Sequence, residues 1–214
     1  MVDNNSSYEV VRPKKFQFIA GDLGLDFCNT VGGKRGRIPR ENLHTYGDFV
    51  SWCEQAGLLD KSEAAALFQK AGRRHAEGAS VLHRAIELRE AIYRIFAALA
   101  EGKKPQTADL ARLNLELARG LGRLRVVADQ DGFVWKWANE EGALDQALGP
   151  IARAAGDLLA RGKVVKHVCQ CVGDNCGWLF VDSSKNHSRR WCDMRDCGNR
   201  AKVRRHRLKQ AKVK

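Results

Sequence analysis

Cys171-Val-Gly-Asp-Asn-Cys176 and Cys192-Asp-Met-Arg-Asp-Cys197 are two cysteine pairs, and each pair encloses four residues. Gly173, Asp174 and Asn175 in the first loop are turn-forming residues, and a tight turn is needed to direct two sulfurs at one metal. Four thiolates in two such pairs are the ligands of a tetrahedral structural zinc site with no open position. The sequence therefore predicts one structural Zn²⁺ ion, held by Cys171, Cys176, Cys192 and Cys197.

Other ligand sets remain open at this point. Cys169 lies two residues before Cys171 and could replace it, although the two equal spacings favour Cys171. His167 and His187 could also bind metal, but both are easier to interpret as surface or nucleic-acid-facing side chains. Disulfides, free thiols or a redox role for Cys169 are the remaining alternatives, and paired cysteines in a reducing compartment more often bind metal.

The positive charge is concentrated next to these cysteines. The chain carries a net charge of +12, and residues 163–214 hold 14 basic against four acidic residues, a net +10. Such asymmetry indicates a polyanionic partner for one end of the molecule. Residues 200–209 place basic side chains on nearly all sides of a predicted helix, with no acid after Asp196, so these like charges repel. The predicted nucleic-acid contacts are Arg189, Arg190, Asn199, Arg200, Lys202, Arg204, Arg205 and Arg207.

Length and composition divide the chain into unequal parts. Residues 1–13 are polar and expected to be flexible, and residues 14–162 are nearly neutral and long enough to bury a core. Residues 163–214 are too few to fold readily without a metal. No apolar run is long enough for a bilayer, and the start lacks a signal-peptide pattern, so we expect a cytoplasmic protein with no membrane partner.

Hydrophobic periodicity predicts a mainly α fold with a β-hairpin (α+β) for residues 14–162. Helical patterns cover about 42–57, 81–99 and 143–161, with further helices starting at Ser62 and after Thr107 as a cap. Alternating residues 123–128 and 133–137 flank Asp131-Gly132, a hairpin turn signal. Residues 16–20 are expected to form a strand, and residues 22–30 either a strand or a helical turn.

The C-terminal part is expected to be a small treble-clef-like zinc-binding module. Its predicted strands cover residues 164–168, 178–181 and 189–191, and its helix covers residues 199–210. A zinc ion would replace the missing core and contribute its binding energy to folding. A disordered basic tail is the alternative for the residues after Lys209.

Two stretches resemble known families. Cys171-Val-Gly-Asp-Asn-Cys176-Gly-Trp-Leu-Phe-Val-Asp-Ser-Ser and Arg189-Arg-Trp-Cys192-Asp-Met-Arg-Asp-Cys197-Gly-Asn-Arg-Ala-Lys-Val203 resemble the CGNR zinc finger family, whose four cysteines are the zinc ligands. Cys169 lies outside that pattern. Ala20-Gly-Asp-Leu-Gly-Leu-Asp-Phe-Cys-Asn-Thr-Val31 is similar to the start of the ABATE domain. The resemblance implies a bacterial, stress-induced transcription regulator whose N-terminal domain is a ligand sensor.

Polar and aromatic residues of the large domain are candidates for such a ligand pocket. We take these to be Asp22, Asp26, Asn29, Arg89 and Trp137, with Trp52 or Trp135 as further walls. The alternative is structural, since Asp and Asn also cap helices and fix turns.

The leading hypothesis is a transcription regulator that binds duplex DNA through the zinc module. Its N-terminal domain would sense a small-molecule effector or a stress signal, or form a homodimer. RNA binding, with bases stacked on Trp178 or Trp191, is an alternative, as is a protein-interaction zinc module. We expect no enzyme, because the sequence has no Ser-His-Asp arrangement or phosphate-cradling glycine loop, and four thiolates leave zinc no open position.

Overall fold

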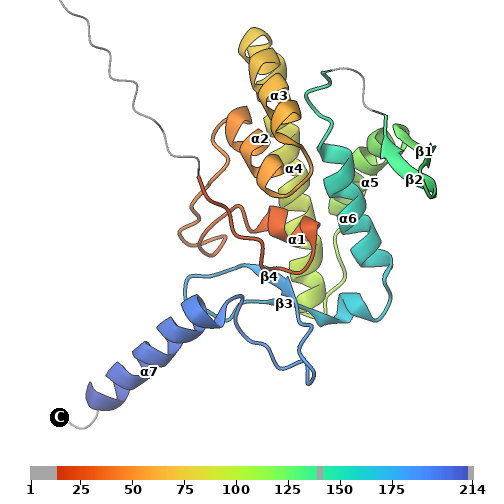
Figure 1. Ribbon diagram of the computed structural model, residues 1–214. Helices are drawn as coiled ribbons and strands as arrows, with labels where there is room; N and C mark the ends of the chain where they lie inside the picture. Colours follow the sequence, from red (N-terminus) through yellow and green to blue (C-terminus); the bar gives the residue numbers. More distant parts are fainter. Residues whose placement is uncertain (1–13, 139–141, 212–214) are drawn as a thin grey trace, which may run out of the picture.

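A bundle of helices forms the large domain. The computed structural model describes residues 14–138 and 142–211. α4 (His75–Ala100), α5 (Thr107–Leu121) and α6 (Leu148–Ala160) pack together, and the short α1 (Leu23–Cys28) contacts both α4 and α6 (Figure 1). α2 (Tyr46–Gln55) and α3 (Lys61–Arg73) pack against each other and against α4. The central core is built of large side chains that are almost fully buried, including Phe27, Phe49, Trp52, Leu88, Ile92 and Phe96.

Capping side chains explain where several helices begin. Thr45 and Asp48 form a capping box at α2, and Asp60 and Glu63 form one at α3. The helix predicted to start at Ser62 begins one residue earlier, at Lys61, because Asp60 is its cap. Thr107 is the first residue of α5 rather than its cap. The helix predicted from residue 143 begins at Leu148, after a turn.

The predicted β-hairpin is present and projects from the side of the bundle. β1 (Leu124–Asp129) and β2 (Gly132–Trp137) are antiparallel, with Val126 opposite Trp135, and they extend from the end of α5 (Figure 1). Gly132 has a φ of 144°, a backbone conformation that favours glycine at this turn.

The segment before the bundle differs from the prediction. Residues 16–20 form no strand; the N–H groups of Ile19 and Ala20 instead donate to Asp26 Oδ1, both at 2.9 Å. The ambiguous stretch that follows is the helix α1, whose cap is Asp22, accepting from the Gly24 N–H at 2.9 Å. Local hydrogen bonds from backbone N–H groups to two aspartates therefore replace strand pairing.

The C-terminal module lies at the end of the bundle below α1. A 3₁₀ turn, Val164–His167, precedes the antiparallel strands β3 (Val168–Gln170) and β4 (Leu179–Val181). A π-helical turn, Met194–Gly198, leads into α7 (Asn199–Ala211), which projects from the body of the protein (Figure 1). Among the described helices, none is both long and apolar enough to cross a membrane.

Two strand predictions in this module are wrong. The strand expected at 164–168 begins only at its last residue, because the 3₁₀ turn occupies the rest. Residues 189–191 form no strand. The N–H of Arg189 donates to Asp182 Oδ2 at 2.8 Å, and β4 pairs with β3 instead.

Candidate metal centre and basic helix

The sulfur atoms of Cys171, Cys176, Cys192 and Cys197 lie within 4.8 Å of one another, and all four residues are buried. The Sγ–Sγ distances are 3.6 Å for Cys176–Cys192 and 3.7 Å for Cys192–Cys197. A tetrahedral zinc ion with Zn–S bonds of about 2.3 Å places its sulfurs roughly 3.8 Å apart. The sulfur atoms are thus already spaced for a tetrahedral zinc site.

The first cysteine pair is positioned by a tight turn between β3 and β4. The Cys171 N–H donates to the Trp178 carbonyl at 2.8 Å, and the Cys176 N–H donates to the Gly173 carbonyl at 3.1 Å. A Cβ at Gly173 would lie 3.1 Å from Cys176 Cβ and 3.3 Å from Cys197 Sγ. Glycine suits this position because a side chain would crowd the ligands.

The second pair spans the π-helical turn that starts α7. Asp193 caps this turn, accepting from the Arg195 N–H at 2.8 Å, and its carbonyl accepts from the Gly198 N–H at 3.0 Å. Cys197 is consequently held two residues before the start of α7 proper, so the metal site fixes the direction of that helix.

The close packing of the sulfurs shifts the pKa values of their thiols in opposite directions. Hydrogen bonds from Cys176 and Cys192 lower the pKa of Cys171 to about 2. The hydrogen bond with the Cys171 thiolate raises the pKa of Cys176 to about 12, and the pKa of Cys192 is also raised. Without a cation the cluster therefore keeps protons, and a zinc ion that binds all four thiolates displaces them.

The alternative ligands lie outside this cluster. Cys169 is half-buried on β3 and is absent from the group of converging sulfurs found among the described residues. The rings of His167 and His187 stack on each other, with centroids 3.7 Å apart. His187 Nδ1 lies 3.0 Å from the carbonyl oxygen of Asp182. These histidines therefore contact each other and the backbone rather than the sulfurs.

Family comparisons agree with the two parts of the structure. A CGNR zinc finger model matches residues 167–210, and an ABATE model, described as "Putative stress-induced transcription regulator", matches residues 21–162. The chain belongs to the ABATE family. It carries a CGNR zinc finger, and the four clustered cysteines of this zinc finger bind one structural zinc ion. No curated protein is similar enough to the chain to count as a match.

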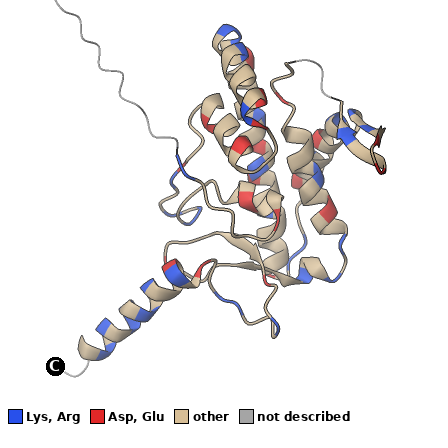
Figure 2. Ribbon diagram, in the orientation of Figure 1, with Lys and Arg blue, Asp and Glu red and all other residues tan. Residues whose placement is uncertain are grey.

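The zinc finger ends in the basic helix α7, none of whose described residues is buried. Lysine and arginine cover it on several sides, and no acidic residue occurs within it (Figure 2). Arg200 pairs with Asp196 at 2.9 Å, and Arg204 pairs with Asp174 in the first cysteine loop. Within residues 14–138 and 142–211, no ion pair holds the remaining cations of α7, which are Lys202, Arg205, Arg207 and Lys209.

Arg189, Arg190 and Asn199 differ in their surroundings. Arg189 donates to the Trp191 carbonyl at 3.0 Å and to the Ile19 carbonyl at 3.3 Å, and it stacks 4.4 Å from the Phe180 ring. It connects the zinc finger to the large domain, so its guanidinium is engaged inside the molecule. Arg190 is exposed. Asn199 donates to the Arg195 carbonyl at 3.0 Å.

The residues predicted to form a ligand pocket are not brought together as a group. Asp22 caps α1, and Trp137 lies on β2, next to the glycines where α5 crosses α6. Asn29 donates to the Leu179 carbonyl at 2.9 Å and accepts from the Leu179 N–H at 3.0 Å. Asp26 and Asn29 do line a common cavity, to which Trp52 also contributes. Burial raises the pKa of Asp26 to about 6.

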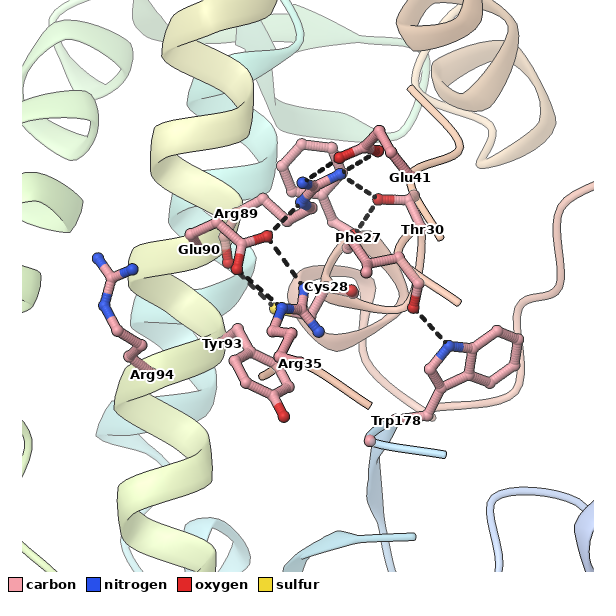
Figure 3. Close-up of polar contacts among 12 residues, drawn as sticks. Phe27, Cys28, Thr30, Arg35, Glu41, Arg89, Glu90, Tyr93, Arg94 and Trp178 are labelled. Atoms are coloured by element: carbon pink, nitrogen blue, oxygen red, sulfur yellow. Dashed lines mark hydrogen bonds and ion pairs between the residues drawn. The ribbon is translucent and has the colours of Figure 1, made fainter. Parts of the chain in front are cut away.

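Arg89 is buried beside this cavity and forms ion pairs with the partly exposed Glu41 and Glu90 (Figure 3). It is 2% exposed and donates to both oxygens of Glu41 at 2.7 Å, and also to Thr30 and Glu90. Burial alone would raise the pKa of Glu41, but the hydrogen bonds and charge of Arg89 outweigh it and lower the pKa to about 2. Sequence reasoning missed Glu41, because no motif marks it and its partner is 48 residues away.

Proposed function

We propose that this protein is a bacterial, stress-responsive transcription regulator whose zinc finger binds duplex DNA through α7. The N-terminal domain would sense a small-molecule effector or form a homodimer, and the protein would work without catalysis in the cytoplasm. The observation that carries the proposal is the exposure of α7, a basic helix with no buried residue that projects from the fold.

The positive charge of α7 suits a polyanionic partner. Lysine and arginine that neutralise phosphates release counterions, which supplies affinity and makes it dependent on salt. An α-helix fits the major groove, where side chains can also reach base edges. Arg205 and Arg207 are exposed cations without an ion pair in the described part of the chain, so they can contact phosphates at little cost.

Zinc makes this surface rigid. Cys197 lies two residues before α7, and Arg200 on the first turn of α7 is 3.3 Å from Cys197 Sγ. The metal site therefore sets the orientation of α7. Trp178, one candidate for stacking RNA bases, donates through Nε1 to the Val31 carbonyl at 2.8 Å and packs within the protein, which favours DNA over RNA.

The test compares two double variants with equal loss of charge. Arg205→Gln with Arg207→Gln should weaken duplex binding. The plot of the log association constant against log salt concentration should become less steep by about 1.8, since each phosphate contact contributes about 0.9. The control, Lys61→Gln with Arg73→Gln on exposed sites of α3, should leave both unchanged.

Fluorescence anisotropy over a range of salt concentrations measures both quantities, with single-stranded RNA as a competitor. Equal effects of the two double variants would contradict a role for α7. Preference for the RNA at matched salt would replace DNA with RNA as the partner.

A further inference from the structure

We propose that a cavity between the large domain and the zinc finger binds a small anionic molecule with a flat apolar body, such as an aromatic carboxylate. The site deepens the proposed sensing function and rests on that function for its regulatory role. Ligand binding itself is measured without DNA.

The cavity has a volume of about 480 Å³ and is lined by four separate parts of the chain. These are the segment 14–17, α1 with the residues that follow it, the loop 40–44 with Trp52 of α2, and Trp178 of the zinc finger. Sites for small ligands commonly measure about 300–1,000 Å³, so the volume suits a molecule of two fused rings.

The charges around the cavity favour an anion. Lys15 and Arg40 are exposed at its rim, and neither forms an ion pair with any residue in the described ranges. Glu41 and Asp26 also line the cavity. Arg89 holds both oxygens of Glu41, and Asp26 Oδ1 accepts from the N–H groups of Ile19 and Ala20. The negative charge of Glu41 is thus already compensated, whereas the two cations are available to a ligand carboxylate, which charge-assisted hydrogen bonds would hold.

The aromatic residues of the cavity favour a flat apolar body. Phe16, Trp52 and Trp178 are among the residues that line the cavity. Trp52 is fully buried, and its Nε1 has no acceptor among residues 14–138 and 142–211. Buried donors normally have a partner. A ligand oxygen in the cavity can supply that acceptor after a small side-chain adjustment.

The cavity adjoins the zinc finger. A second cavity, of about 370 Å³, shares Gln17, Arg40 and Trp178 with the first and reaches Arg200 at the start of α7. The carbonyl of Trp178 accepts the hydrogen bond that closes the first cysteine turn. A ligand that contacts Trp178 therefore touches a residue that is hydrogen-bonded to the metal ligand Cys171. A shift of Trp178 on ligand binding would move the metal site and, with it, α7.

The test follows the indole N–H signals of the five tryptophans by ¹⁵N NMR on the zinc-loaded full chain. The probe is 2-naphthoate, and the uncharged 2-naphthalenemethanol is its matched control. We expect 2-naphthoate to shift the signals of Trp52 and Trp178 and to leave those of Trp135 and Trp137 on β2 in place. The alcohol should bind more weakly.

Two substitutions of exposed arginines complete the test. Arg40→Gln should weaken 2-naphthoate binding roughly tenfold, the loss expected for one charge-assisted hydrogen bond. Arg125→Gln on β1 should not change it. The proposal is overturned if Trp52 and Trp178 do not shift, if all five signals shift alike, if acid and alcohol bind equally, or if Arg40→Gln binds like Arg125→Gln. None of these outcomes depends on DNA binding.

Discussion

Glu41 and Arg89 show how a buried residue depends on a partly exposed partner. Arg89 is 2% exposed, and Glu41 accepts two hydrogen bonds from it at 2.7 Å. Removing one partner of such a pair leaves a buried charge without compensation. We expect Glu41→Gln to lower the free energy of unfolding at neutral pH by about 1–3 kcal/mol. This loss is smaller than for a fully buried pair because Glu90 remains and Glu41 is partly exposed.

The same pair predicts a pH dependence. The pKa of Glu41 is about 2 in the folded protein against 4.5 for an ordinary glutamate. A lowered pKa contributes stability above pH 4.5, and this contribution is lost as the pH falls towards 2. Urea denaturation of wild type and Glu41→Gln should therefore differ at pH 7 and converge as the pH falls through this range. Glu101→Gln, which removes an exposed partner of Lys103, is the control and should have little effect at either pH.

At the scale of elements, the crossing of α5 and α6 depends on two glycines. A Cβ at Gly149 would lie 2.9 Å from Gly120 Cα and 3.0 Å from the Trp137 ring. We expect Gly149→Ala to push the helices apart and to cost about 1–3 kcal/mol. Gly72→Ala is the control, since nothing lies within 4 Å of its Cβ on α3, and alanine there should stabilise by up to about 1 kcal/mol. Thermal unfolding should show melting temperatures shifted in opposite directions, and equal shifts would contradict the argument.

The sequence predicted elements whose signals are local. The apolar repeat of α4 and the Asp131-Gly132 turn of the hairpin need only their neighbours to be recognised. α1 could not be told from a strand, because its six residues are shaped by the Asp22 cap and by contacts with α4 and α6. The wrong strand at 189–191 has a similar cause, since the Arg189 N–H bonds to Asp182 and the Arg189 side chain to Ile19, 170 residues away.

The same distinction applies to the sites of the whole molecule. The zinc site was predictable because its ligands fall within a short stretch and their spacing reflects the geometry of one metal. The cavity was not predictable, because its walls come from segments near Lys15, Arg40, Trp52 and Trp178. Only tertiary packing brings these together. Of the residues that line the cavity, Asp26 and Asn29 were predicted, because they lie in the stretch 20–31 that resembles the start of the ABATE domain.

Asn29 joins the two parts of the molecule, and its removal tests how tightly they are coupled. Its side chain bonds to both the N–H and the carbonyl of buried Leu179 on β4. Unpaired buried backbone groups are costly. We therefore expect Asn29→Ala to speed hydrogen exchange of the Leu179 amide by roughly 10- to 100-fold, through local opening of the zinc finger from the large domain.

Amide exchange measured residue by residue by NMR tests this expectation. The amides of α4 should remain slow in Asn29→Ala, because the helical core does not depend on this contact. The control is Asn199→Ala, which removes an exposed asparagine bonded to the Arg195 carbonyl and should leave β4 unchanged. Equal acceleration of α4 and β4 would show that the zinc finger and the large domain open only as one unit, so that Asn29 is no local hinge between them.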